Sequence, residues 1–107
     1  HNGRRRQRQM CIRDRGVESM VRSAAATYSK RGIRVNAVAP GLTETRLSSP
    51  ITSSEASKDA AVSMIPLNRI NKAEEVAATM HWLLTEAPDN ITGQVFHLDG
   101  GMSNVRS

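Results

Sequence analysis

The chain has 107 residues, a length that suffices for one small domain. No apolar run approaches the roughly 20 residues that a membrane-spanning helix needs, and a single cysteine, Cys11, excludes an internal disulfide. Aromatic residues make up only 3% of the chain, too few for a surface that stacks on single-stranded nucleic acid. The scarcity of cysteine suits a reducing compartment, so we expect a cytoplasmic protein.

The positive charge is concentrated at the N-terminus. The formal net charge is +5, and residues 1–15 alone contain six arginines against one acidic residue, Asp14. Residues 16–107 therefore have no net charge. A charged block at a chain end is typical of a disordered tail rather than of a basic patch on a folded surface. We expect residues 1–15 to be a basic extension, disordered or artefactual, and residues 16–107 to form the folded part.

The first predicted element is an amphipathic helix. Apolar residues recur there at spacings of three and four, which places them on one helix face: Val17, Met20, Val21, Ala24 and Tyr28. Lys30 and Arg31 followed by Gly32 predict its C-terminal end, because cations complement the helix dipole and glycine adopts the left-handed cap.

A strand is predicted immediately after this helix. Residues 33–38 are short and rich in β-branched side chains, and Pro40-Gly41 ends the run. A helix, a glycine and a strand with almost no spacer are typical of an α/β unit. Residues 42–53 are polar and rich in turn residues, so they are expected to form a long loop.

The second half predicts two further helices and a second strand. Residues 54–64 are compatible with a short helix that Pro66 ends. Asn71 and Glu74 resemble a capping box, in which an N-cap side chain and a glutamate three residues later satisfy free backbone N–H groups. The following apolar stripe predicts a helix to about Glu86: Val76, Ala77, Met80, Leu83 and Leu84. Residues 94–98 predict a strand that ends at Asp99-Gly100-Gly101.

These elements predict an α/β fold, the C-terminal part of a doubly wound, Rossmann-like sheet with two parallel strands and two to three helices. Strands joined by a helical crossover run parallel, with a right-handed connection. A parallel pair needs cover on both faces and along its edges. Two strands and three helices cannot supply all of it, so the segment is expected to be part of a larger sheet.

Pro40-Gly41 is the candidate ligand-binding motif. In open α/β sheets ligands bind beyond the carboxyl ends of the strands, where this dipeptide is expected. Proline fixes the backbone, and glycine, which has no Cβ, lets the chain lie against a flat ligand. A proline-glycine pair after a strand is, however, more often a plain turn.

Three segments of the chain resemble the short-chain dehydrogenases/reductases: GIRVNAVAPGLTETRL, IPLNRINKAEEVAATMHWLL and ITGQVFHLDGG. The resemblance covers residues 16–107, and it is greatest to the 3-oxoacyl-carrier-protein reductase and glucose dehydrogenase type. It implies an NAD or NADP cofactor, and an oxidoreductase that transfers hydride between a hydroxyl and a carbonyl of a small molecule. It also implies a homotetramer or homodimer for the parent protein.

The resemblance assigns roles to individual residues. Pro40 and Gly41 match the family's proline-glycine loop, and Leu42 would hold the nicotinamide carboxamide through its backbone. Thr45 would add a hydroxyl contact to the carboxamide or phosphate. Residues 46–66 match a mobile substrate lid, and the turn at Asp99 matches one with a structural role.

The family's catalytic pair has no counterpart in this chain. The family carries a tyrosine as general acid/base and, four residues later, a lysine that lowers the tyrosine pKa and holds the ribose. Counting back from Gly16 places these at positions 10 and 14, which are Met10 and Asp14. Tyr28 is no substitute, because the residue four positions later is Gly32. We expect no catalytic residue here, and a chain that lacks the phosphate loop and is inactive alone.

The abrupt change at Gly16 suggests that residues 10–15, MCIRDR, are translated adapter sequence joined to a genuine reading frame. The alternative function is a nucleic-acid-binding module that uses the arginines from Arg4 to Arg15. Nothing in residues 16–107 supports that alternative. His81 and His97 lack a second ligand at metal spacing, so no metal, nucleic acid or membrane is expected as a partner.

Overall fold

The structure, a computed structural model, describes residues 2–44 and 55–105, with side chains over 15–44 and 57–105. Its elements in chain order are α1 (Asn2–Tyr28), the 3-10 turn η1 (Ser29–Arg31), β1 (Ala37–Pro40), β2 (Thr43–Glu44), α3 (Glu55–Ser63), β3 (Asn71–Lys72), α4 (Ala73–Thr85) and β4 (Val95–Leu98). The predicted α/β class is confirmed. The structure adds two very short strands, β2 and β3, which the sequence did not predict.

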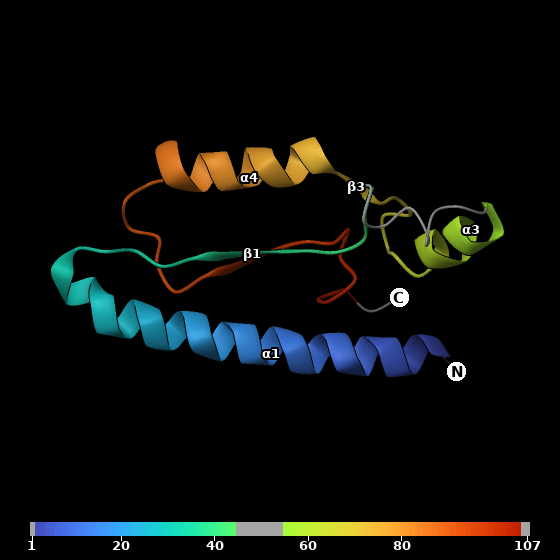
Figure 1. Cartoon of the computed structure of the whole chain (residues 1–107), viewed down its shortest axis with the longest axis horizontal. Helices are drawn as coiled ribbons and strands as arrows, with labels where there is room; N and C mark the ends of the chain where they lie inside the picture. The colour runs from blue at the N-terminus through green and yellow to red at the C-terminus, as the bar shows by residue number, and fades with distance from the viewer. Residues whose placement is uncertain (1, 45–54, 106–107) are drawn as a thin grey trace.

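The strands β1 and β4 form a parallel pair between two helices (Figure 1). Ala37 lies opposite Val95 and Pro40 lies opposite Leu98, so both strands end at the same level. α1 runs along one face of the pair and α4 covers the other (Figure 1). The predicted parallel arrangement is confirmed, and it brings the carboxyl ends of both strands to one edge of the molecule.

The helix α1 ends as the sequence predicts. Gly32 adopts a left-handed conformation with φ 74°, and its N–H donates to the Ser29 carbonyl at 2.9 Å. At the other end, the backbone of residues 2–15 continues the same helix through Gly16. The prediction that residues 1–15 are an extension foreign to the fold stays a prediction.

The strand β1 begins four residues later than predicted, at Ala37 instead of residue 33. Its first ladder bond is donated by Ala37 N–H to the Gln94 carbonyl at 2.9 Å. Before it, side chains replace part of the ladder: Asn36 bridges to the Gln94 N–H and the Ile91 carbonyl, and Thr92 accepts the Val35 N–H. The predicted segment is thus bonded to its neighbour along its length, but only its last two residues, Ala37 and Val38, belong to the regular strand.

The second parallel pair, β2 with β3, lies just beyond the end of β1. Thr43 lies opposite Asn71 and Glu44 lies opposite Lys72. This pairing corrects the predicted helix start. The N-cap of α4 is Lys72, and the carboxylate that caps its backbone N–H, at 3.0 Å, belongs to Glu75. Asn71 lies one residue before the cap, and its side chain donates to the Leu98 carbonyl instead of accepting from the helix.

The hydrophobic core is small. Only four apolar residues in the described part of the chain are buried: Val21, Ala25, Ile65 and Ala87. Several large apolar side chains are exposed instead, including Leu84 at 81% and Leu67 at 68%. None of the described helices is both long enough and apolar enough to span a membrane. The thin core agrees with the expectation that two strands and their helices do not bury a full core by themselves.

Candidate functional site

The segment Pro40–Leu42 leaves the carboxyl end of β1 and lies against the end of β4. Gly41 N–H donates to the Leu98 carbonyl at 2.9 Å, which extends the β1–β4 pairing one residue past the strand. Thr43 Oγ1 donates to the Gly41 carbonyl at 3.0 Å and closes a short turn. The motif therefore stands where open α/β sheets bind their ligands.

Glycine at position 41 is required by a close approach of two chain segments. A Cβ atom built on Gly41 would lie 2.8 Å from the Asp99 Cβ and 3.0 Å from its Cα. Carbon atoms that are not bonded do not approach one another so closely, and neither Asp99 atom is the end of a flexible side chain. The sequence suggested that glycine here makes room for a ligand; the structure shows that it also makes room for Asp99.

Asp99 is a buried carboxylate that organises the turn after β4. Its Oδ1 accepts the Gly101 N–H at 3.0 Å and its Oδ2 accepts the Ser103 N–H at 3.1 Å. The side chain is 5% exposed, and His97 Nδ1 lies 4.0 Å from Oδ2. With both oxygens bonded to backbone donors, Asp99 fixes the turn, in agreement with the structural role that the sequence predicts.

Of the two backbone hydrogen-bonding groups of Leu42, only the carbonyl has a partner among the described residues. Its carbonyl accepts the Asn71 N–H at 2.9 Å. No described residue accepts a hydrogen bond from its own N–H. Leu42 as a residue is partly exposed, so an N–H without a partner among the described residues is available to water or to a ligand. Leu42 thus offers one donor at the end of the sheet.

Two polar residues near this segment were not identified as site residues from the sequence. Asn71 is 7% exposed, and its Nδ2 donates to the Leu98 carbonyl, the same oxygen that accepts from Gly41. Arg69 forms a two-pronged ion pair with Glu75, in which Nη1 lies 3.0 Å from Oε2. No short-range pattern reveals the Asn71 contact, because Asn71 reaches across 27 positions of the chain.

The ion pair changes the acid–base properties of both side chains. Hydrogen bonds from the Arg69 guanidinium and, next, the Lys72 backbone N–H lower the pKa of the Glu75 carboxyl below its ordinary value. The same hydrogen bond and the charge of Glu75 raise the pKa of Arg69. Glu75 is therefore ionised at neutral pH and joins Arg69, two residues before β3, to the first turn of α4.

A small cleft of about 230 Å³ opens beside these residues. It is lined by Leu67, Arg69, Asn71, Glu75, His97, Leu98, Asp99, Gly100 and Gly101. The polar groups that line it are already committed: Arg69 to Glu75, Asn71 to Leu98 and Asp99 to its turn. The cleft is better described as the outer side of the turn than as a reaction site.

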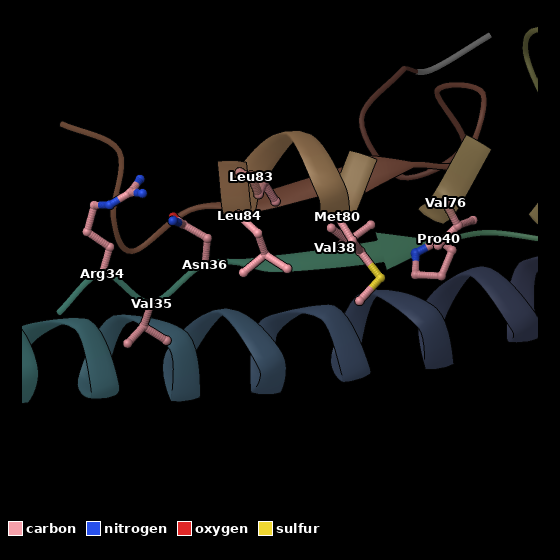
Figure 2. A pocket seen from close by; sticks show the side chains of 9 residues that line it. All are labelled: Arg34, Val35, Asn36, Val38, Pro40, Val76, Met80, Leu83 and Leu84. Carbon is pink, nitrogen blue, oxygen red and sulfur yellow. The ribbon is translucent and has the colours of Figure 1, made fainter. Parts of the chain in front are cut away.

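A larger hollow of about 540 Å³ lies between α4 and β1 (Figure 2). Apolar side chains from both elements line it: Val38 and Pro40 from β1, and Val76, Met80, Leu83 and Leu84 from α4. Arg34 lies at one end, held by the Pro88 and Ile91 carbonyls at 3.2 and 3.3 Å. This apolar hollow beside β1 agrees with the uncovered side that the sequence led us to expect.

The predicted site residues fall into three groups. Pro40, Gly41 and Leu42 lie together at the end of β1, as predicted. Thr45 and residues 46–54 of the predicted lid lie outside the described residues, as do the side chains of residues 10 and 14. Tyr28 is 41% exposed at the far end of α1 from the motif. Over the part of the chain that the structure describes, no three His, Cys, Asp or Glu side chains could hold a metal.

Comparisons with known proteins agree with the resemblance of the sequence. A family model described as enoyl-(acyl carrier protein) reductase matches residues 2–103. Glucose 1-dehydrogenase 2 of Bacillus subtilis is 40% identical over 88 residues, which cover 82% of this chain and 34% of that protein. The 3-oxoacyl-[acyl-carrier-protein] reductase FabG of Thermotoga maritima is 41% identical over 87 residues, which cover 81% and 35%.

A solved structure shows the same arrangement of elements. The RhlG/NADP active-site complex of Pseudomonas aeruginosa is 30% identical and superposes with a TM-score of 0.74, over 81% of this chain and 35% of that one. The chain thus spans about a third of the length of the relatives that it matches. The fold, the three sequence blocks and the family match all place the chain in the short-chain dehydrogenase/reductase family.

Proposed function

We propose that residues 16–107 are the C-terminal portion of an NAD- or NADP-dependent oxidoreductase that transfers hydride between a hydroxyl and a carbonyl. In this proposal Pro40, Gly41 and Leu42, with Thr45, form the nicotinamide side of the cofactor site. The observation that carries it is the Leu42 N–H, which has no partner among the described residues and lies at the carboxyl ends of two parallel strands. One solved relative of this fold is a complex with NADP.

The contact to the cofactor follows from the chemistry of the two Leu42 groups. The nicotinamide carboxamide has a carbonyl acceptor and an amino donor. The Leu42 carbonyl already accepts the Asn71 N–H, whereas the Leu42 N–H has no partner among the described residues, so we assign this N–H to the carboxamide oxygen. Gly41 supports this contact, since its bond to Leu98 holds the backbone of the turn in place.

The cofactor supplies the hydride when it is bound, and these residues fix the orientation of its nicotinamide end. Positioning of this kind lowers the activation barrier, because the entropy of bringing the reactants together is lost on binding and not in the reaction step. We propose that no residue of this chain is a catalytic residue, since methionine and aspartate occupy positions 10 and 14. The substrate, a small alcohol or carbonyl compound, and an assembly into dimers or tetramers are proposed for the whole protein.

Titration of the chain with NAD⁺ tests the cofactor site. Backbone amide resonances of Gly41 and Leu42 are expected to shift with NAD⁺ but not with ADP-ribose, which carries the same nucleotide without nicotinamide. The affinity is expected to be weak, because the chain spans only about a third of its relatives. Equal shifts with both ligands, or no shift at millimolar NAD⁺, would contradict the proposal.

Activity of the purified chain tests the catalytic part of the proposal. With NADH or NADPH and a β-keto ester as substrate, no oxidation of the nicotinamide is expected, because methionine has no proton to exchange. Measurable turnover that follows the 107-residue chain through purification would show that a catalytic group is present.

A further inference from the structure

We propose that Asn71 is a positioning residue, which holds Pro40–Leu42 against the end of β4 and thereby sets the direction of the Leu42 N–H. This inference rests on the proposed function, because it assigns Asn71 a role in the cofactor site described above. Asn71 would not touch the cofactor. It would act through the backbone of the turn that does.

Three segments meet at Asn71. Its backbone N–H donates to the Leu42 carbonyl at 2.9 Å, and its side-chain Nδ2 donates to the Leu98 carbonyl. The Leu98 carbonyl also accepts the Gly41 N–H at 2.9 Å. Asn71 therefore ties the turn after β1, through the Leu42 carbonyl, to the last residue of β4, whose carbonyl also holds Gly41.

The chemistry of the amide makes the side-chain contact directional. A carbonyl oxygen can only accept, so the Asn71 amide must present its nitrogen to Leu98. The side chain is 7% exposed, and a buried amide that lost this acceptor would be left with an unpaired donor. Both features oppose rotation of the Asn71 side chain. They therefore keep the carbonyls of Leu42 and Leu98, which Asn71 binds, at a fixed separation.

Three other polar side chains near the turn, those of Asp99, Arg69 and Glu75, make different contacts. Both carboxylate oxygens of Asp99 accept hydrogen bonds within its own turn, from the N–H groups of Gly101 and Ser103. Arg69 and Glu75 bind each other and the start of α4. Among the described side chains, Asn71 is the one whose side-chain hydrogen bond reaches the carbonyl that also holds Gly41.

Amide hydrogen exchange of the 107-residue chain tests the tether. In Asn71→Ala, exchange at the Gly41 amide should accelerate about tenfold, since a lost hydrogen bond raises local opening by that order. The amides of Ala37 and Gly93, which bond across the other end of the sheet, should be unchanged. Asn90→Ala, at an exposed turn residue, is the matched control and should match the wild type at all three.

Two results of this experiment overturn the proposal. Equal acceleration at Gly41, Ala37 and Gly93 would show that Asn71 only adds to overall stability, and unchanged exchange at Gly41 would show no tether. If the variant does not fold, the wild-type protein still decides. A scalar coupling across the hydrogen bond from Asn71 Nδ2 to the Leu98 carbonyl carbon is expected, and its absence contradicts the tether.

Titration with NAD⁺ separates this inference from the proposed function. If Asn71 positions the cofactor contact, the shift of the Leu42 amide with NAD⁺ should fall at least several-fold in Asn71→Ala and persist in Asn90→Ala. An equal shift in both variants overturns the positioning role. No shift in the wild type overturns the proposed cofactor site instead, and the exchange rates then decide whether the tether exists.

Discussion

Gly41 lies so close to Asp99, at the point where the two parallel strands end, that position 41 has no room for a side chain. A Cβ on Gly41 would lie 2.8 Å from the Asp99 Cβ, and the adjacent Gly41 N–H bonds to Leu98. The turn after β1 and the turn after β4 are therefore one structural unit. Any cofactor contact made by Leu42 depends on how closely these two turns can approach.

Replacement of Gly41 by alanine should destabilise the chain. The added methyl group meets the backbone and Cβ of Asp99, neither of which can rotate away, so we expect a loss of about 1–3 kcal/mol in the free energy of unfolding. Urea unfolding followed by circular dichroism measures this loss.

The matched control for that variant is Gly16→Ala. A Cβ at Gly16 meets nothing within 4 Å, and the residue lies inside α1. Alanine favours a helix over glycine by about 1 kcal/mol, so the control should be more stable than the wild type. A Gly41→Ala protein as stable as Gly16→Ala would refute the close approach of the two turns.

The packing of α1 on the sheet predicts a second pair of variants. Ala25 is 5% exposed and faces Gly93, whose added Cβ would lie 3.6 Å from the Ala25 methyl group. Ala25→Leu should therefore cost about 1–3 kcal/mol by overpacking. Ala26→Leu, at the exposed neighbouring position, should stay within about 0.5 kcal/mol of the wild type. Equal effects in thermal unfolding would mean that α1 does not pack on this face.

The sequence predicted those parts of the fold that short-range patterns determine. The end of α1 at Gly32 and the apolar stripe of α4 depend on residues close in the chain, and both are confirmed. The start of β1 was wrong by four residues, because side-chain bonds from Asn36 take the place of ladder bonds. Such bonds depend on residues 55 or more positions away, and no local pattern shows them.

In the candidate site, too, the sequence could indicate only what short stretches of residues determine. The position of Pro40-Gly41 after a predicted strand indicated the motif, and the resemblance added Leu42. Asn71 was assigned to a helix cap because asparagine favours that position, but its side chain bonds to Leu98 and the cap is Lys72. Local propensity was overruled here by a contact with a distant segment, which only the three-dimensional structure shows.

The ion pair between Arg69 and Glu75 predicts a dependence of stability on pH. The hydrogen bond from Arg69 lowers the pKa of Glu75 in the folded chain. The contribution of the ion pair to the free energy of unfolding is therefore complete above the pKa that Glu75 has in the unfolded chain, about 4.3. It is lost as the pH falls through the lower pKa of the folded chain. Wild type should exceed Glu75→Gln in unfolding free energy at pH 6, and the difference should shrink below pH 4.

The control for this titration is Glu74→Gln. Glu74 shares the first turn of α4 and its dipole but is exposed. Its stability difference from the wild type should be smaller and should vary less between pH 6 and pH 3. If the two variants give the same pH profile, the effect belongs to the helix dipole and not to Arg69.

The apolar surface beside α4 predicts how the chain behaves in solution. Leu84 is 81% exposed and lines the hollow between α4 and β1, and unpaired strand edges and exposed apolar surfaces promote association (Figure 2). Leu84→Lys should raise the soluble concentration of the purified chain and lower its apparent mass in light scattering. Its unfolding free energy should change by less than about 0.5 kcal/mol, since the side chain is mostly in solvent.

The control is Leu67→Lys, because Leu67 is equally apolar and 68% exposed but lies outside that hollow. If both variants improve solubility equally, general surface polarity explains the effect. If only Leu84→Lys does, association proceeds through the side of β1 that a larger sheet would cover.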